Sequence, residues 1–554
     1  MSAPANRLAG LDGAALDAVV IGGGMAGAGV ARDLALRGAS VALFEKGDFA
    51  SGTSSKSSKL IHGGLRYLEL GDFKLVRESL REKKTLERLA PQLVRPLPFL
   101  VPVYRGSPRG LITVRIGMWL YDLLTPGKTT ERYRVLRPAA TLALEPSVRA
   151  DDLRGAGYYF DDLLLYPERL CLENVLSAAR HGARTFNYCE VEEFVHGRRG
   201  IEGVKVRDLL SGHVLPVRAA VIVNCAGPWV DRLRATARVA DRSPKVLRTT
   251  KGIHCLLPRM TDRAVYLSTR DDRMIFVIPW REFSLVGTTD TDFDGDPDRL
   301  WATREEVTYL LEEVAKVLPD KRATFENVVY TYAGVRPLSF EPGAAGAASP
   351  GGAASKVSRD HRVVPEGPDG RFLSVTGTKL TCFRSLAEDV GDRVMRLLGR
   401  GDKSRTARLT LDGVDEEVGK VEARVWMDVS EEMAATGLSR ATMRTLVETY
   451  GRSYPRVLDL GRKLPDGFER LCPSNPEIVA QLHHAVREEQ AVSLQDFLLR
   501  RTGIGHSRCQ GLDCAEPVAA RMAELGGWSR RRLDAELEAY SQHVERSRRF
   551  RQRA

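Results

Sequence analysis

The sequence lacks the features that define several common protein classes. It contains no run of 18 or more apolar residues, so no transmembrane helix is expected. The N-terminal residues MSAPANRLAGLDGAAL hold no basic segment followed by an apolar one, so no secretory signal is expected. The eight cysteines form no CxxC pair, which argues against zinc or an iron–sulfur cluster. We therefore predict no metal site.

The remaining composition describes a globular protein of more than one domain. At 554 residues the chain is too long for a single core, so two or three domains are expected. Scattered cysteines favour reduced thiols in a cytoplasmic protein, with a redox pair of Cys509 and Cys514 as the alternative. The net charge of +11 fits nucleic acid, an anionic membrane surface or an anionic substrate, and charge alone does not choose among them.

The order of the expected elements indicates an α/β fold. Residues 17–23 read as a buried strand, followed by a glycine turn and a helix to about residue 37, and residues 40–44 read as a second strand. Such a β-α-β unit opens a doubly wound sheet. Alternating strands between about 245 and 335 predict an antiparallel sheet, and the pattern after about 405 is mostly helical.

A glycine motif lies at the turn of the β-α-β unit. Gly22, Gly24 and Gly27 have the GxGxxG spacing, directly after a strand and at the start of a helix. The first glycine permits the tight turn, the second lets the backbone approach a pyrophosphate, and the third allows close packing of helix on strand. Glu45, at the end of the second strand, is placed to accept hydrogen bonds from a ribose diol. The motif predicts dinucleotide binding.

A second motif follows in residues 53–69, which are rich in small hydroxyl groups and then in basic and glycine residues. Such a run offers many short donors to phosphate and ring atoms, with glycines where backbone must pass close to a planar cofactor. The alternative is a serine-rich surface loop before a helix, which accounts poorly for the HGG turn. The residues predicted here to contact the cofactor are Thr53, Ser54, Ser57, Ser58, Lys59, Leu60, His62 and Gly63.

The run SSKLIHGGLRYLE at 57–69 resembles the signature of FAD-dependent glycerol-3-phosphate dehydrogenases of the respiratory, quinone-linked kind. Further matching motifs follow in the family's order. They are NCAGPW (224–229), KGIH (251–254), FVIPW (276–280), GTTDTD (287–292), YAGVRPL (332–338), SRDH (358–361) and TKLT (378–381). The resemblance covers roughly 17–390 and continues more loosely through the C-terminal region.

This resemblance implies a fold with three parts. An FAD-binding Rossmann-like domain, of the glutathione-reductase and D-amino-acid-oxidase type, is expected from three separate segments. An antiparallel-sheet substrate domain and a C-terminal helical domain complete the chain. The expected bounds are 17–90, 150–245 and 357–400 for the FAD-binding domain, 91–149 and 246–356 for the substrate domain, and 410–554 for the helical domain.

The resemblance also implies roles for individual residues. The expected reaction is oxidation of sn-glycerol 3-phosphate to dihydroxyacetone phosphate, with hydride transfer from C2 to FAD. His254 would take the hydroxyl proton, and the arginines Arg336 and Arg359 would clamp the phosphate. His254, Arg336 and Lys379 are the predicted catalytic residues, Lys379 lying near the flavin's pyrimidine edge. The other predicted contacts are Arg66 and Tyr67 for the substrate, and Gly227, Gly377, Thr378, Leu380 and Thr381 for the cofactor.

Two positions depart from the family pattern. Thr378 precedes Lys379 where the family usually has glycine, and His361 stands where a tyrosine is common. Both segments keep their charged residue, but the differences leave the detailed geometry of substrate binding open. The Gly/Ala-rich segment 343–356 is also longer than the family pattern would suggest, and its composition predicts a flexible loop.

In respiratory members of the family a membrane quinone accepts the electrons, and the enzyme lies on the inner face of the membrane without crossing it. The segment 108–124 is the candidate membrane-interface segment, and a buried helix of the substrate domain is the alternative. Three other functions stay open: a soluble oxidase that uses oxygen, a flavoprotein that modifies nucleic acid, and a non-enzymatic nucleotide-binding module. We expect no nucleic-acid partner, and a homo-oligomer is compatible with the sequence.

Overall fold

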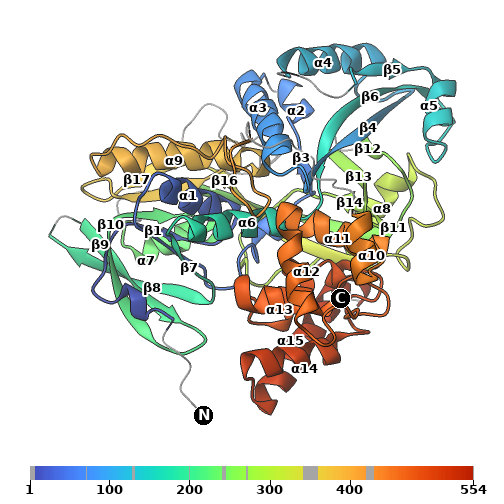
Figure 1. Cartoon of the computed structure of the whole chain (residues 1–554). Helices are drawn as coiled ribbons and strands as arrows, with labels where there is room; N and C mark the ends of the chain where they lie inside the picture. Colours follow the sequence, from blue (N-terminus) through green and yellow to red (C-terminus); the bar gives the residue numbers. More distant parts are fainter. Residues whose placement is uncertain are drawn as a thin grey trace.

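A computed structural model describes residues 7–69, 71–125, 127, 131–198, 200–239, 245–269, 273–340, 360–377, 379–418 and 429–552. These residues form two β-sheets and a C-terminal group of helices, which packs at the lower right in Figure 1. The predicted flexible loop at 343–356, together with Arg359 and Thr378, lies outside the described residues.

The first sheet has eight strands and begins with the predicted β-α-β unit. Its main path runs β17 (Arg362–Glu366), β18 (Phe372–Thr376), β10 (Val214–Asn224), β1 (Ala15–Ile21), β2 (Val41–Phe44) and β7 (Arg184–Phe186). The strands from β18 to β7 pair in parallel, and β17 is antiparallel to β18. The hairpin of β8 (Cys189–Gly197) and β9 (Gly200–Asp208) continues the sheet from β10.

Helix α1 (Met25–Leu36) is almost completely buried because its small side chains allow close packing. It contacts both α6 (Pro167–Arg180) and α9 (Phe383–Leu397), and together with β1 and β2 these helices form one hydrophobic core. A β-carbon at Gly29 would lie 3.0 Å from the ring of Phe383, so a larger residue would separate α1 from α9. The buried charge of Arg37 is balanced by Asp33 at 2.6 Å.

The second sheet has ten strands. Its main path runs β15 (Thr291–Asp292), β11 (Leu247–Pro258), β14 (Phe283–Gly287), β13 (Met274–Trp280), β12 (Ala264–Ser268), β4 (Val94–Tyr104), β6 (Leu153–Leu164) and β3 (Leu60–Ile61). Strand β16 (Tyr330–Ser339) pairs with β11, and β5 (Arg134–Leu136) pairs with β6. Every strand pair in this sheet is antiparallel except β12 with β4, which is parallel. The predicted antiparallel sheet is therefore present, but the full sheet is mixed because of this one parallel pair.

Several helices cover this sheet. Helices α2 (Leu65–Glu69), α3 (Phe73–Leu89) and α4 (Leu111–Leu124) lie near β3 and β6 at the top of Figure 1, with α5 (Pro138–Leu144) beyond β6. Helix α8 (Arg304–Ala315) contacts β11 and begins with a capping box of Thr303 and Glu306. Within the described ranges, no helix has both the length and the apolar character needed to cross a membrane.

The C-terminal helices comprise α10 (Ser430–Thr436), α11 (Arg440–Tyr450), α12 (Tyr454–Arg462), α13 (Val479–Glu488), α14 (Ala515–Gly526) and α15 (Arg530–Arg548). The short helices η9 (Asp496–Arg501) and η10 (Ile504–His506) link α13 to α14. The predicted helical region is therefore confirmed. One predicted boundary differs, because residues 153–164, expected in the FAD-binding part, form β6 and pair with β4 along its length.

A candidate site between the two sheets and the C-terminal helices

A cavity of about 1280 Å³ lies where the two sheets and the C-terminal helices meet. Most of the predicted site residues line it. These are Gly22, Gly24, Glu45, Thr53, Ser54, Ser57, Ser58, Leu60, His62, Tyr67, Gly227, His254, Arg336, Gly377, Lys379, Leu380 and Thr381. Gly27, Lys59, Gly63 and Arg66 are not among the lining residues.

The glycine motif forms the turn from β1 into α1 at one end of the cavity. Gly22 has a φ of +104°, and a β-carbon there would lie 2.6 Å from the carbonyl oxygen of Cys225. A β-carbon on Gly27 would lie 1.9 Å from the carbonyl oxygen of Gly22, which explains why glycine is required at position 27. Gly24 is the N-cap of α1, and Ser54 Oγ accepts a hydrogen bond from Met25 N at 2.9 Å. The turn thus brings backbone and the positive end of α1 to the cavity.

Glu45 follows β2 beside the glycine turn. Its Oε2 accepts a hydrogen bond from Gly23 N at 2.6 Å, and its Oε1 accepts one from Gly47 N at 2.8 Å. Burial raises the pKa of Glu45 in spite of these two backbone donors. Each carboxylate oxygen retains a further lone pair, so Glu45 can accept additional hydrogen bonds from a diol in the cavity.

The hydroxyl-rich segment is held by hydrogen bonds to the second sheet. Thr53 Oγ1 donates to the carbonyl oxygen of Val335 at 2.7 Å, and Tyr332 Oη donates to that of Ser57 at 2.7 Å. Lys59 does not line the cavity; its Nζ lies 3.6 Å from Glu168 Oε1 and 4.6 Å from the ring centroid of Trp280. Its part in the structure is therefore a buried ion pair.

His254 lies on β11 with 2% of its surface exposed. Its Nε2 is 2.8 Å from Ser58 Oγ, and its ring stacks on that of Tyr332 with centroids 4.8 Å apart. Its Nδ1 is buried and has no hydrogen-bond partner among the described residues. Burial, followed by the positive charges of Arg336 and Lys59, holds the pKa of His254 well below its usual value near 6.5. The ring is therefore neutral at pH 7 and can accept a proton.

Arg336 projects from β16 across β11. Its guanidinium pairs with Asp290 Oδ1 at 3.1 Å and donates to Thr288 Oγ1 at 2.8 Å and to the carbonyl oxygen of Thr289 at 3.1 Å. A β-carbon at Gly252 would lie 2.3 Å from Arg336 Nη2, so the glycine of the KGIH motif makes room for this side chain. The cavity wall thus holds a cation in a fixed orientation, which suits recognition of an anion.

Lys379 is buried beside the HGG turn. Its Nζ donates to the carbonyl oxygen of His62 at 2.8 Å and to Ser79 Oγ at 2.9 Å, and it is 5.0 Å from the ring centroid of Tyr67. Gly63 N donates to Tyr121 Oη at 2.7 Å behind the same turn. Lys379 therefore brings a held positive charge to the cavity and also fixes the turn.

The C-terminal helices supply cavity residues that carried no signal in the sequence. Arg500, His506, His543 and Arg546 all line the cavity, together with Lys56 of the hydroxyl-rich segment. Their positions depend on contacts between distant segments, such as Tyr330 Oη with His543 Nε2 at 3.0 Å. Burial, together with Arg500, Lys59 and Arg546, lowers the pKa of Lys56 to about 8, although Glu168 opposes the shift.

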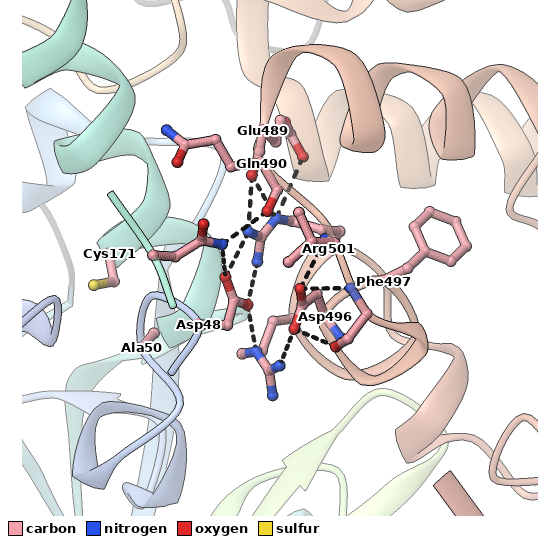
Figure 2. A network of polar contacts seen from close by, with 12 residues as sticks. Asp48, Ala50, Cys171, Glu489, Gln490, Asp496, Phe497 and Arg501 are labelled. Atoms are coloured by element: carbon pink, nitrogen blue, oxygen red, sulfur yellow. Dashed lines mark hydrogen bonds and ion pairs between the residues drawn. The ribbon is translucent and has the colours of Figure 1, made fainter. Parts of the chain in front are cut away.

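A buried polar network joins the cofactor side of the cavity to the C-terminal helices (Figure 2). Asp48, three residues after Glu45, accepts hydrogen bonds from Arg501 at 2.7 and 2.9 Å and from Arg500 at 2.5 Å. Arg501 also donates to the carbonyl oxygen of Glu489 at 2.8 Å, and Arg500 donates to Asp496 at 2.6 Å. The loop that carries Glu45 is thus tied to η9.

Comparisons with known proteins agree with this arrangement. Residues 17–354 match the family model of FAD dependent oxidoreductases, and residues 381–533 match the C-terminal domain of alpha-glycerophosphate oxidase. The chain is 36% identical to a glycerol-3-phosphate dehydrogenase of Synechocystis sp., covering 96% of this chain and 97% of the relative. It is 34% identical to the aerobic glycerol-3-phosphate dehydrogenase of Staphylococcus aureus, covering 96% and 94%.

Solved structures show the same similarity. The crystal structure of the glycerol-3-phosphate dehydrogenase from Bacillus halodurans complexed with FAD has a TM-score of 0.80 and 28% identity, covering 99% of this chain and 98% of that one. The L-alpha-glycerophosphate oxidase from Mycoplasma pneumoniae, also with FAD bound, shares the fold at a TM-score of 0.55 and 18% identity, covering 71% and 97%.

Proposed function

This chain belongs to the FAD-dependent oxidoreductase family that includes the glycerol-3-phosphate dehydrogenases, and we propose that it oxidises sn-glycerol 3-phosphate to dihydroxyacetone phosphate. The observation that carries the proposal is one cavity holding a neutral buried histidine and a fixed arginine beside the glycine turn. A proton acceptor and an anion receptor are the two groups that a phosphorylated secondary alcohol requires.

The residues of this cavity fit FAD. Gly24 leaves backbone open to the cavity, since a β-carbon there would meet only Ser54 Oγ within 4 Å, at 3.2 Å. Glu45 offers acceptors for a ribose, and the start of α1 suits a pyrophosphate. When bound, FAD supplies the acceptor for the hydride that leaves C2 of the substrate. Lys379 supplies a positive charge that would stabilise negative charge on the reduced cofactor.

The chain's own residues supply the acid–base chemistry and the binding of the phosphate. His254 takes the proton of the C2 hydroxyl, because its ring is neutral and the residue lines the cavity. Ser58 orients the ring through Nε2. Arg336 binds the phosphate, and Arg359 is assigned the same role by the family motif. Arg66 and Tyr67 remain predicted substrate contacts, of which Tyr67 lines the cavity.

The proposed function is tested by anaerobic titration of the purified holoenzyme. We expect sn-glycerol 3-phosphate to bleach the flavin absorbance, with dihydroxyacetone phosphate as the product, and glycerol to leave the absorbance unchanged. Bleaching by glycerol at equal concentrations would show that the phosphate is not recognised. A protein that binds FAD but is bleached by neither compound would contradict the whole assignment.

Replacing Arg336 by alanine is expected to raise the KM for sn-glycerol 3-phosphate far more than it lowers kcat. Loss of charged hydrogen bonds costs about 1.5–3 kcal/mol, which corresponds to about 10- to 150-fold in KM. Steady-state kinetics would measure this split, with Arg462→Ala as control because Arg462 pairs with Asp459 and Glu432, and none of the three lines the cavity. An unchanged KM would remove Arg336 from the phosphate site.

We further propose that the electron acceptor is a membrane quinone and that α4 docks on the inner membrane surface. Helix α4 packs inward through Val114, Met118 and Tyr121, which are buried. On its other side Ile112, Ile116, Trp119 and Leu123 are 77%, 54%, 52% and 67% exposed. Their spacing of four, three and four residues forms one apolar stripe, and in Figure 1 the helix lies at the edge of the molecule.

Charge around the stripe favours an anionic lipid surface as its partner. Arg115 of α4 is exposed, and so are Arg132, Arg134 and Arg137 near β5, which contacts α4. Each basic residue near an anionic bilayer contributes about 1 kcal/mol of attraction. The apolar stripe would enter the interface while the arginines contact the headgroups.

A double replacement, Ile116→Glu with Trp119→Glu, is expected to weaken binding to vesicles by about tenfold or more, since losing burial of two large apolar side chains exceeds 1.4 kcal/mol. Cosedimentation with vesicles of phosphatidylglycerol and phosphatidylcholine would measure it, with phosphatidylcholine alone as reference. Leu209→Glu is the matched control, because Leu209 is 44% exposed but lies after β9. Equal sedimentation of wild type and double variant would contradict the docking proposal.

The alternative acceptor is oxygen, and the match of residues 381–533 to the C-terminal domain of an oxidase keeps it as the second candidate. Stopped-flow reoxidation of the substrate-reduced enzyme separates the two. We expect rapid reoxidation by menaquinone or ubiquinone and slow reoxidation by oxygen. Rapid release of hydrogen peroxide would favour the oxidase instead.

A further inference from the structure

A cluster of sulfur atoms lies in the C-terminal helical region, outside the cavity. Cys472 is located between α12 and α13, whereas Cys509, Asp513 and Cys514 belong to the segment between η10 and α14. The Sγ atoms of Cys472 and Cys509 are 3.8 Å apart. Ligand atoms of Cys472, Cys509 and Asp513 all lie within 4.8 Å of one another. The proposed oxidation of glycerol 3-phosphate uses none of these residues.

We propose that Cys472, Cys509 and Asp513 form a zinc site. Two thiolates bound to one zinc at about 2.3 Å in tetrahedral geometry lie about 3.8 Å apart, which is the separation found here. Sulfur atoms in a disulfide lie about 2.05 Å apart, so the pair would have to approach much more closely to form one. Two cysteines and one carboxylate are ligands that zinc accepts.

Neighbouring side chains support metal binding by orienting the ligands. Asn475 Nδ2 lies 3.1 Å from the Sγ of Cys472 and 3.5 Å from that of Cys509, so it can donate to both. Ser507 Oγ lies 3.3 Å from the Sγ of Cys509. An amide donor such as Asn475 stabilises thiolates and fixes their orientation. The cluster therefore has both the ligands and the surrounding donors of a built site.

The carboxylate and the fourth position complete the coordination. Ser474 Oγ donates to Asp513 Oδ2 at 3.3 Å, which leaves Oδ1 available to a metal. Cys514 is buried nearby, but its Sγ is not among the ligand atoms that lie within 4.8 Å of one another, so a water molecule would take the fourth position. Three protein ligands and one water molecule give zinc its usual tetrahedral coordination.

Binding would involve displacement of protons and no transfer of electrons. Each thiol that becomes a ligand releases one proton, and the zinc ion keeps its charge of two. The zinc would tie the segment before α13 to the segment after η10. Since η10 carries His506, which contacts Trp280 and Tyr330, the tie would steady one wall of the cavity.

The experiment is metal analysis of the holoenzyme. After saturation with ZnSO₄ and dialysis against metal-free buffer, we expect about one zinc per chain by inductively coupled plasma mass spectrometry. Cys472→Ser and Cys509→Ser should each hold less than about a tenth of this amount. Cys189→Ala is the matched control, because Cys189 is also buried but lies on β8 away from the cluster, and it should retain one zinc.

A second measurement keeps the proposal testable if a cysteine variant does not fold. Cobalt(II) bound by two thiolates gives a charge-transfer band in the near ultraviolet. The band is measured by subtracting the absorbance spectrum of the zinc-loaded holoenzyme from that of the cobalt-loaded holoenzyme. Asp513→Asn, at an exposed position, should weaken zinc binding by at least tenfold. Wild-type protein without zinc and without this band would overturn the proposal. A thiol assay of the wild-type protein gives the other contradicting outcome. If two more thiols react after treatment with a reductant than before it, the cysteines form a disulfide and the zinc proposal is wrong.

Discussion

Replacing His254 by glutamine is expected to slow flavin reduction at saturating sn-glycerol 3-phosphate by about 10²- to 10⁴-fold, the usual contribution of a general base. Glutamine can keep a hydrogen bond to Ser58, whose Oγ is 2.8 Å from Nε2, but it cannot accept the substrate proton. Stopped-flow absorbance under anaerobic conditions measures the step directly. The KM should change much less than the rate, because the phosphate contacts come from other residues.

The control for this substitution is His213→Gln, at an exposed position in the hairpin before β10, which should leave the rate unchanged. His254→Ala should be at least as slow as His254→Gln, since it also removes the contact with Tyr332. A His254→Gln enzyme within tenfold of the wild-type rate would show that another group accepts the proton.

The same histidine determines the expected pH dependence. Its pKa is held well below 6.5, so the base is neutral throughout the range from pH 6.5 to 8. The rate of flavin reduction at saturating substrate should therefore stay level in this range, and its fall on the acid side should lie below pH 6.5. An acid limb at or above pH 6.5 would contradict a buried neutral base.

Replacing Arg501 by methionine is expected to lower both the affinity for FAD and the free energy of unfolding of the protein. Asp48 and Arg501 are both buried, and removing one partner of a buried ion pair costs about 3–5 kcal/mol because the other charge stays unpaired. Arg500 still contacts Asp48, which places the expected loss at the lower end of this range. Because Asp48 lies in the loop that carries Glu45, the disturbance would reach the cofactor site.

Release of FAD in urea, followed by flavin fluorescence, measures this effect. The midpoint for Arg501→Met should fall clearly below that of wild type, whereas Arg462→Met should match wild type because its pairs with Asp459 and Glu432 are exposed. The double variant Asp48→Ala with Arg501→Met should recover part of the loss, since the buried Asp48 carboxylate is then absent and Arg500 keeps its pair with Asp496. Equal midpoints for Arg501→Met and Arg462→Met would show that η9 does not support the cofactor loop.

The pH dependence of this contact has a defined sign. Burial alone would raise the pKa of Asp48, but Arg501 and Arg500 outweigh it and lower the pKa to about 2. The contribution of the pair to stability is therefore complete above the usual aspartate pKa near 3.8 and is lost as the pH falls toward 2. Acid release of FAD in the wild type should follow this window.

The sequence alone determined those parts of the fold that depend on local pattern. The strands β1 and β2, helix α1 and the turn at Gly22 could be predicted because a GxGxxG turn needs positive φ and close packing at fixed spacings. The helical C-terminal region and an antiparallel sheet over about 245–335 could likewise be expected from local periodicity, although which strands pair could not. Long family motifs added His254, Arg336 and Lys379, which the structure brings to one cavity.

Other features were decided only by the tertiary structure, because they depend on which distant segments meet. Nothing in the spacing of Asp48 and Arg501 indicates an ion pair, yet the docking of η9 buries both charges and makes pairing necessary. Likewise, Cys472 and Cys509 are 37 residues apart and form no CxxC motif, yet they face each other at 3.8 Å. Local spacing specifies turns and helices, whereas contacts across the fold follow from the packing of whole elements, which no local pattern encodes.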